Sequence, residues 1–243
     1  MTTRDYFDAI QRSGAHYSGE NYRFYLSQIT RGVDFAGKRV LDIGGGGGNL
    51  TLYAVSRGAV LGVCLEPEAD GSSVGMHESF ERTAAILHAG DRARLVRRTI
   101  QDFVWDGELF DLILLHNSIN HIDEPATERL HRDEKARETF RAIFRKIGGL
   151  AVPGARLLIA DCDRYNVWRF VPGVTNPFAR TIEWHKHQPP ERWAAVARGG
   201  GFETERVIWT SLNTLREPGR LLLGNRVAAY LLRSHFAMWL RKH

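Results

Sequence analysis

The clearest chemistry in this sequence is a run of five consecutive glycines at positions 44–48, which follows the apolar residues Val40, Leu41 and Ile43. Without Cβ atoms, a backbone can adopt positive φ values and let a ligand come close to its peptide groups. The N–H groups of a helix that starts at Asn49 would face that ligand. No Gly-Lys-Ser/Thr sequence follows the run, so it lacks the lysine and hydroxyl of a nucleotide phosphate loop. The stretch predicts a strand, a tight turn and a helix, with a ligand at the turn.

Imidazole and amide groups are concentrated after a second apolar run, which covers residues 110–115. They belong to His116, Asn117, Asn120 and His121. A histidine, with its ordinary pKa near neutrality, can take the proton from a hydroxyl or amine as that group reacts. We predict that His121 is such a general base. The alternative is an imidazole that only holds this loop in place, because positioning alone can carry much of such a reaction.

The segment 163–193 combines aromatic residues, Trp168 among them, with several arginines and the pair His185 and His187. Aromatic and guanidinium groups suit a planar or anionic small molecule. A His-x-His pair can also bind a metal, but alternating residues share a face only in an extended segment, and no third ligand is evident. We therefore expect substrate contact first, packing second and metal binding last.

The order of strand-like and helix-like segments explains how these groups come together. From residue 38 onward the two kinds alternate, which predicts an α/β fold with a mostly parallel sheet and helices on both faces. Because the carboxyl ends of parallel strands meet at one edge of a sheet, we expect the glycine run and the histidines at that edge. Strands are expected near residues 38–43, 60–65, 93–98, 110–116, 155–161, 202–210 and 233–241. Helices are expected near residues 49–57, 74–89, 128–147, 190–199 and 218–231.

The N-terminal residues 1–35 carry many aromatic side chains and no strand-like alternation. Tyr6 and its apolar neighbours fall at helical spacing, a second helix is expected from about Glu20, and Tyr17 lies in the loop between them. We expect a helical arm that either packs on the sheet or forms a lid over a ligand. The chain then divides into this arm and one α/β domain, residues 36–243.

Composition limits the class of protein. With 243 residues, 43% of them hydrophobic, the chain is long enough for one large domain with a sizeable core. The net charge of +5 is thinly spread apart from a basic bias near the C-terminus, and no dense basic block with interleaved aromatics occurs, so no nucleic-acid partner is expected. The two cysteines, Cys64 and Cys162, lie in apolar runs and are expected to be reduced core thiols. No apolar run reaches membrane-spanning length, so we expect a cytoplasmic monomer or homodimer without a membrane partner.

The glycine run belongs to a larger motif, in which Asp42, Gly44, Gly46 and Gly48 read Asp-x-Gly-x-Gly-x-Gly. This motif, with the order of segments from about residue 36 onward, resembles the class I S-adenosylmethionine-dependent methyltransferases, and among them the small-molecule group. The resemblance implies a Rossmann-like sheet of seven strands whose last strand is antiparallel. It also implies S-adenosyl-L-methionine as the cofactor and methyl transfer to an oxygen or nitrogen of a small-molecule acceptor.

The resemblance further implies where the cofactor lies. Glu66, at the end of the second strand, would hold the ribose hydroxyls, although apolar Leu65 stands where the acid is more common. Gln101 or Asp102 would meet the adenine, with a plain turn role for Asp102 as the alternative. The additional glycines of the run, beyond the motif, are expected only to loosen the turn. The implied cofactor contacts, of which the last two border the sulfonium and its methyl group, are Asp42, Gly44, Gly46, Gly48, Glu66, Gln101, Asp102, His116 and Asn117.

In similar methyltransferases the insertion after the fifth strand, here residues 163–193, forms part of the acceptor pocket. His187 lies just before the helix expected at 190–199, where a histidine can face the site, and is a second possible base beside His121. The predicted acceptor contacts are Tyr6, Tyr17, Asn120, Trp168 and His185.

The sequence also contains oxygen-bearing side chains that could bind a metal ion. Asp161 and Asp163, with Asn117, could hold a magnesium ion as catechol-type methyltransferases do. That group keeps an aspartate at the end of the fourth strand, where this chain has His116, so no metal is expected. The Asn/Asp-Pro-Pro-Tyr sequence of the methyltransferases that act on adenine and cytosine amines is missing at this strand too, which argues against nucleic-acid bases as acceptors.

Two other functions stay open. A nicotinamide-dependent oxidoreductase has a related fold, but its Gly-x-Gly-x-x-Gly fingerprint fits only in part, because Asn49 stands where the third glycine is needed. A non-catalytic or RNA-directed relative of the methyltransferases is the other alternative. Binding measurements with S-adenosylmethionine, its demethylated product and NAD would separate the three.

Overall fold

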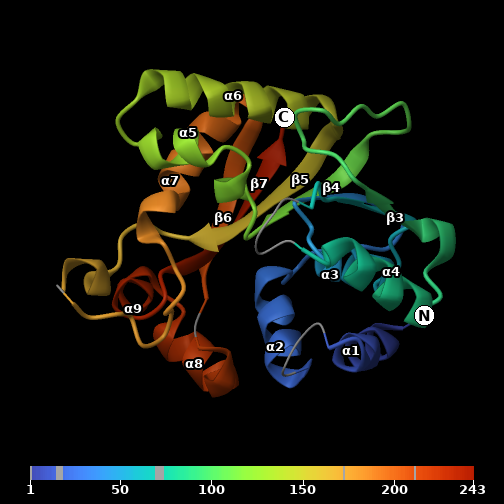
Figure 1. The fold of residues 1–243 in the computed structure, drawn as a ribbon, viewed down its shortest axis with the longest axis horizontal. Coiled ribbons are helices and arrows are strands. Elements are labelled where there is room, and N and C mark those ends of the chain that lie inside the picture. The colour runs from blue at the N-terminus through green and yellow to red at the C-terminus, as the bar shows by residue number, and fades with distance from the viewer. Residues whose placement is uncertain (1, 15–18, 69–73, 172, 211) are drawn as a thin grey trace.

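The computed structural model describes residues 2–14, 19–68, 74–171, 173–210 and 212–243. They form a seven-stranded sheet in the order β3-β2-β1-β4-β5-β7-β6 (Figure 1). β7 is antiparallel to both of its neighbours and the other neighbouring strands are parallel, as predicted. The strands are β1 (Arg39–Ile43), β2 (Leu61–Leu65), β3 (Ala93–Val96), β4 (Phe110–His116), β5 (Ala151–Cys162), β6 (Phe202–Trp209) and β7 (His235–Lys242).

The helices also follow the predicted order, but two of the expected helices are each divided in two. Asp133 caps a new helix by accepting a hydrogen bond from the Lys135 amide, and Asn225 does the same for the Ala228 amide. Each cap ends the preceding helical segment and starts another. The helices are α1 (Thr3–Arg12), α2 (Gly19–Ile29), α3 (Asn49–Ser56), α4 (Met76–Ile86), α5 (Glu124–Arg129), α6 (Glu134–Gly149), α7 (Pro190–Ala197), α8 (Arg216–Leu223) and α9 (Arg226–Leu231).

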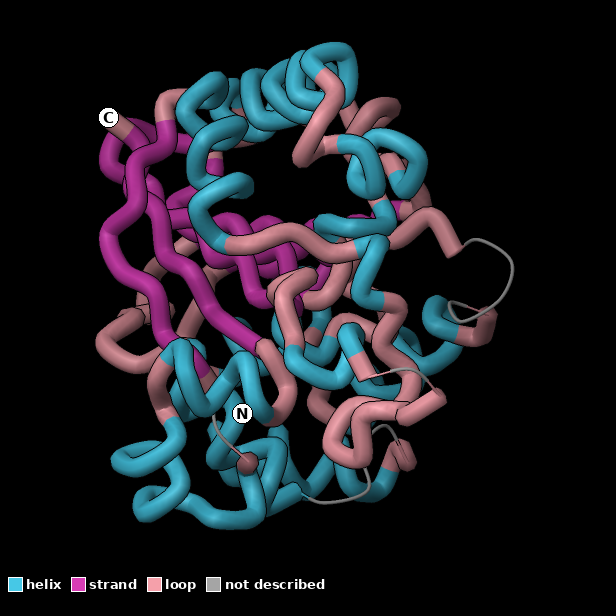
Figure 2. The backbone as a smooth tube through the Cα atoms, turned by 90° about the vertical axis from the view of Figure 1, so that its left-hand side faces the viewer, coloured by secondary structure: helices cyan, strands magenta, loops and turns pink. Residues whose placement is uncertain are grey.

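The sheet lies between two helical layers (Figure 2). A cluster of buried apolar side chains lies on each face of the sheet. α6 and α7 pack on one face, while α1, α2 and α3 pack on the opposite face (Figure 1). Because the central strands are covered on both sides, residues 112–115 of β4 are all buried. This double cover is the reason that the strands read as unbroken apolar runs in the sequence.

The N-terminal helices belong to this packed layer. Leu26 and Ile29 of α2 are fully buried, and the indole nitrogen of Trp239 in β7 donates a 2.7 Å hydrogen bond to the Ile29 carbonyl oxygen. Tyr6 and Ile10 of α1 are fully buried as well. A helical lid is therefore not confirmed, and the first of the two expected arrangements, packing on the sheet, is the one observed. The division at residue 35 stays a prediction.

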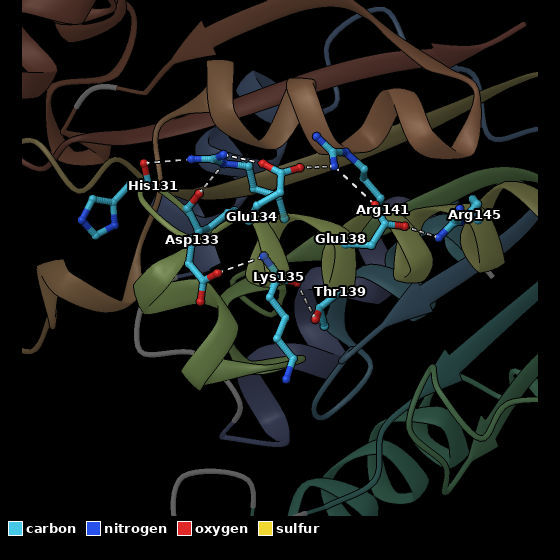
Figure 3. A network of polar contacts seen from close by, with 10 residues as sticks. His131, Asp133, Glu134, Lys135, Glu138, Thr139, Arg141 and Arg145 are labelled. Carbon is cyan, nitrogen blue, oxygen red and sulfur yellow. Dashed lines mark hydrogen bonds and ion pairs between the residues drawn. The ribbon is translucent and has the colours of Figure 1, made fainter.

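A ladder of ion pairs runs along the exposed side of α6 (Figure 3). Glu134 pairs with Arg137 and Arg141, and Glu138 pairs with Arg141 and Arg145. Such exposed pairs contribute little to stability, because water and salt screen them. The opposite side of the helix is buried and apolar, so the ladder marks the solvent face of an amphipathic helix.

Both cysteines are free thiols in the core, as expected, and burial raises the pKa of the Cys64 and Cys162 thiols. Within the described part of the chain, no helix combines the length and the apolar character needed to span a membrane.

Candidate functional site

The glycine loop joins β1 to α3 and is held tightly by its surroundings. Gly44, Gly46 and Gly48 have φ values of 66°, 54° and 73°, which side-chain-bearing residues rarely adopt. A Cβ on Gly48 would lie 2.1 Å from the ring of Phe80 in α4, and one on Gly44 would lie 2.6 Å from Cβ of Ser118 after β4. The loop is thus in contact with two neighbouring segments of the chain.

The additional glycines of the run do more than loosen the turn, so that expectation was wrong. A Cβ on Gly45 would lie 2.7 Å from the Cys64 sulfur and 2.8 Å from Asp42 Oδ2. One on Gly47 would lie 2.9 Å from the Ser79 hydroxyl. These contacts come from β1, β2 and α4, so a local reading of the turn could not reveal them.

Asp42 anchors the start of α3. Its Oδ2 atom accepts hydrogen bonds from the Thr51 amide (3.1 Å) and hydroxyl (2.9 Å). Its Oδ1 atom is buried and has no hydrogen-bond partner among the described residues. Burial raises the pKa of Asp42 to about 7, against the opposing effect of the Thr51 hydrogen bonds. One oxygen of Asp42 therefore has unused capacity to accept a hydrogen bond.

Glu66 brings the end of β2 onto the glycine loop. Its Oε2 atom accepts a 2.9 Å hydrogen bond from the Gly46 amide, and its Oε1 atom accepts one of the same length from the Glu68 amide. The side chain is buried. Two of the acidic residues predicted to contact the cofactor, Asp42 and Glu66, thus flank the same turn.

The predicted adenine contacts lie after β3, where both side chains are exposed and bonded to nearby segments. Asp102 Oδ2 accepts a 2.7 Å hydrogen bond from the Thr99 hydroxyl, which is the turn role weighed as its alternative. Gln101 Nε2 donates to the Ile122 carbonyl oxygen at 3.1 Å. This bond joins the segment after β3 to the segment after β4.

Histidines gather where β4 ends and β7 begins. The Tyr25 hydroxyl of α2 lies 2.8 Å from His116 Nε2, and Asn117, with a φ of 52°, places Oδ1 3.2 Å from His235 Nε2. Burial, reinforced by nearby Arg233, lowers the pKa of His235 to about 3, so this ring is neutral. The sequence analysis missed Tyr25 and His235. The antiparallel direction of β7 was the available signal, because it brings the first residues of that strand to the edge where the parallel strands end.

His121 lies at the same edge but is half exposed. Its side chain is 54% accessible, and Nδ1 lies 2.7 Å from Glu124 Oε1. Its other nitrogen, Nε2, lies 3.2 Å from the amide nitrogen of Asn120. Asn120 itself is buried, and its Oδ1 atom has no hydrogen-bond partner among the described residues.

His187 is held by a buried aspartate at the end of β5. Its Nδ1 atom lies 2.8 Å from Asp161 Oδ1, and the two side chains are only 12% and 1% accessible. With a carboxylate as partner, Nδ1 carries the proton and Nε2 carries the lone pair. That Nε2 atom makes no hydrogen bond to any described residue. In this pair, His187 can accept a proton at Nε2, while the Asp161 carboxylate holds its Nδ1 atom.

Two curated proteins resemble this sequence. No protein-family model matches the sequence. A ubiquinone biosynthesis O-methyltransferase of Aromatoleum aromaticum is 25% identical over 209 residues, covering 79% of this chain and 75% of the relative. A protein of the same name from Marinobacter nauticus is 24% identical over 207 residues, covering 81% of this chain and 76% of the relative.

Solved structures show the same fold. A putative S-adenosylmethionine-dependent methyltransferase from Listeria monocytogenes superposes with a TM-score of 0.62 at 12% identity, covering 91% of this chain and 99% of that one. The magnesium protoporphyrin IX methyltransferase of Synechocystis PCC 6803, solved with bound S-adenosylhomocysteine, has a TM-score of 0.57 at 13% identity, covering 98% and 94%. The chain has the fold of the class I S-adenosylmethionine-dependent methyltransferases.

The topology of the sheet also disfavours the nicotinamide alternative. A dinucleotide-binding Rossmann sheet has the all-parallel order 3-2-1-4-5-6. Here β7 lies antiparallel between β5 and β6. The sheet therefore departs from the oxidoreductase pattern in the half where the acceptor is expected to bind.

The other predicted acceptor contacts bond to different parts of the chain or are not among the described residues. The Tyr6 hydroxyl donates to the Asn49 carbonyl oxygen (2.9 Å) at the start of α3, and Trp168 donates to the Leu231 carbonyl oxygen (2.9 Å) in α9. His185 is exposed, 3.5 Å from Glu128. Tyr17 is not among the described residues. The assignment of these residues to an acceptor stays a prediction.

The carboxylates considered for a metal take other partners. Asp161 holds His187, and Asp163 accepts a 3.0 Å hydrogen bond from the Tyr165 amide. Among the residues that the structure describes, no group of three or more metal-ligating side chains is found.

Proposed function

We propose that this methyltransferase transfers the methyl group of S-adenosylmethionine to a hydroxyl oxygen of a small-molecule acceptor, with His187 as the general base. The curated relatives support the choice of oxygen, because both are named O-methyltransferases of ubiquinone biosynthesis. The observation that carries the proposal is the buried Asp161–His187 pair, located at the same edge of the sheet as the glycine loop.

The residues around the glycine loop fit the cofactor. An unpartnered buried oxygen of Asp42 can accept a hydrogen bond from an ammonium group, and Glu66 can accept from ribose hydroxyls. His116 and Asn117, at the end of β4, would border the methyl group of the bound cofactor, and Gln101 and Asp102 would contact its adenine. When bound, S-adenosylmethionine supplies the methyl group as an electrophilic carbon on a sulfonium.

The base is His187 rather than His121, which was our first choice from the sequence. Both ring nitrogens of His121 already have close partners, and its ring is half exposed to water. In contrast, His187 has one nitrogen fixed by Asp161 and the other available. His187 Nε2 accepts the hydroxyl proton as the acceptor oxygen takes the methyl group, and the Asp161 carboxylate stabilises the imidazolium.

A methyl-transfer screen tests the function and the base together. Labelled S-adenosylmethionine is incubated with a panel of phenolic metabolites and with wild-type enzyme, His187→Ala or His121→Ala. We expect His187→Ala to lose about 10²- to 10⁴-fold in kcat, the usual contribution of a general base. His121→Ala should stay within a few-fold of wild type.

Calorimetry with S-adenosylhomocysteine is the control, since neither substitution should change its affinity. Loss of turnover in His121→Ala alone would return the role to that residue. Tight binding of NAD, with no binding of either adenosyl ligand, would contradict methyl transfer altogether.

A further inference from the structure

A buried arginine without a carboxylate partner in the described structure lies just after the end of β5, close to the proposed base. Arg164 follows β5 and is only 6% accessible, yet its guanidinium makes a single hydrogen bond among the described residues, from Nη1 to His131 Nδ1 at 2.8 Å. A buried charge is costly unless it is paired, and a guanidinium has five N–H donors to satisfy. Arg164 is therefore a buried cation with no acidic partner among the described residues, and most of its N–H donors make no hydrogen bond to them.

Three further arginines surround Arg164. Arg192 of α7 donates from Nη1 to the Leu130 carbonyl oxygen, and its Nε atom is buried without a partner in the described structure. Arg169 donates to the Arg164 carbonyl oxygen. Burial lowers the pKa of Arg164, and the charges of Arg169, Arg192 and Arg132 lower it further. We call these four arginines, together with His131, the Arg164 cluster.

The histidine of the cluster acts as an acceptor. Burial and the charge of Arg164 lower the pKa of His131, so its ring is neutral and its Nδ1 atom can accept the bond from Arg164. Figure 3 shows His131 beside the start of α6, with its ring pointing away from the ion-pair ladder. The acids of that ladder therefore serve α6 and not the Arg164 cluster.

The acids on the neighbouring elements are engaged elsewhere. Glu191 pairs with Arg226 at 2.6 Å, Glu128 lies 3.5 Å from His185, and Asp133 caps α6. Asp163 is buried next to Arg164 in sequence, and its Oδ1 atom accepts a bond from the Tyr165 amide. Burial raises the pKa of Asp163 to about 6 against the opposing charges of Arg226 and Arg164, and no ion pair joins it to Arg164 in the described structure. The cluster thus carries an excess of positive charge that the described side chains do not neutralise.

We propose that the Arg164 cluster binds an anionic group, a carboxylate or a phosphate, of the methyl acceptor. Guanidinium groups donate paired hydrogen bonds to such groups, and a cluster of them in a partly dehydrated position binds an anion more strongly than one on the open surface. Recognition of an acidic group would supply the counter-charge that Arg164 lacks.

The position of the cluster suits an acceptor that also reaches His187. Arg164 is three residues after Asp161, and three residues span at most about 10 Å. The segment that carries His187 is fastened to α5 by a 2.6 Å hydrogen bond from Gln188 to the Thr127 carbonyl oxygen. Base and cluster are thus held together by β5 and α5. Only the assignment of the anion to the acceptor rests on the proposed function.

Binding of simple anions to the full chain tests the inference. Inorganic phosphate and benzoate serve as the phosphate and carboxylate probes, titrated at constant ionic strength set with chloride. The variants are Arg164→Gln, Arg192→Gln and, as the matched control, Arg180→Gln, an exposed arginine of the same insertion. We expect wild type and Arg180→Gln to bind at least one probe alike, and the other two variants to bind it about tenfold or more weakly.

Three outcomes would overturn the inference. They are no binding of either probe to wild type, unchanged binding in Arg164→Gln, or competition between the probe and S-adenosylhomocysteine, which would place the anion in the cofactor site. S-adenosylhomocysteine affinity shows that each variant is folded, and if Arg164→Gln fails this control, Arg192→Gln decides. A failure of methyl transfer would be distinguishable, because it appears in the adenosyl titration of wild type and not in the anion titration.

Discussion

At the scale of single residues, the site depends on carboxylates that are buried without being fully satisfied. Asp42 and Asp161 each have one buried oxygen with no partner among the described residues. In Asp42 the other oxygen holds the helix that follows the glycine loop, and in Asp161 it holds the proposed base. Each carboxylate thus fixes a neighbouring element and retains one oxygen for other use.

Asp42 gives a stability prediction with a definite sign. Its folded-state pKa of about 7 is above the ordinary value of 3.8, so between these values the folded state binds a proton that the unfolded state has lost. Stability from this residue therefore falls as pH rises from about 4 to about 7, by at most roughly 1.4 kcal/mol per pH unit. Urea unfolding of wild type and Asp42→Asn at pH 5, 6, 7 and 8 measures it. We expect the variant to gain stability relative to wild type as pH rises, and a difference that does not change with pH would count against the raised pKa.

His187 shows what could and could not be learned at this scale from the sequence. Its type and its place before a helix made it a candidate, but Asp161 lies 26 positions earlier in the chain and was weighed only as a metal ligand. Pairing of side chains from a strand end and a long insertion is set by the tertiary structure. Local spacing therefore identified the histidine but not the aspartate, which is our reason for proposing His187 rather than His121 as the base.

At the scale of elements, strands were predicted well because the core covers both faces of the sheet. The apolar runs that became β1, β2 and β4 begin and end within a residue of the expected positions. The division of two expected helices was not predicted, because the prediction followed apolar periodicity and gave too little weight to Asp133 and Asn225 as caps. Both are residue types that favour helix starts, so the signal was present in the sequence.

The glycine loop leads to a prediction at the same scale. Gly48 and Gly75 both precede a helix in the left-handed conformation, with φ values of 73° and 81°, but only Gly48 is in contact with a ring, that of Phe80. The left-handed backbone costs alanine about 1–2 kcal/mol at either position. Overlap with Phe80 should add about 1–3 kcal/mol or more at Gly48. Chemical unfolding of Gly48→Ala and Gly75→Ala compares them, and equal losses would mean that the loop is not packed as described.

At the scale of the whole molecule, the N-terminal helices complete one of the two layers that enclose the sheet. The tyrosine-rich sequence of residues 1–35 fits an arm over a ligand as well as a packed layer, because aromatic residues serve both. Burial decides in favour of the layer, and burial depends on β7, which lies about 200 residues away in sequence; the indole of Trp239 bonds to residue 29. No local pattern contains that contact.

Substitution in α2 tests whether the helix is part of the core. Leu26 is fully buried, whereas Leu222 of α8 is 75% accessible. Leu26→Ala should lower the free energy of unfolding by about 2–5 kcal/mol, and Leu222→Ala should have little effect. Denaturant titration gives both values. A lid would instead leave stability nearly unchanged in Leu26→Ala while turnover falls.

The position of β7 also affects how the protein is made. β7 follows β6 in the chain but lies between β5 and β6 in the sheet. During synthesis, β6 leaves the ribosome first and has no strand of the growing sheet to pair with until β7 appears. Strands β1 to β5 can assemble earlier, since each of β2 to β5 pairs with a strand already made. The nascent chain therefore completes its sheet only when β7 emerges and pairs with β5 on one side and β6 on the other. This step also completes the edge of the sheet at which the proposed site lies.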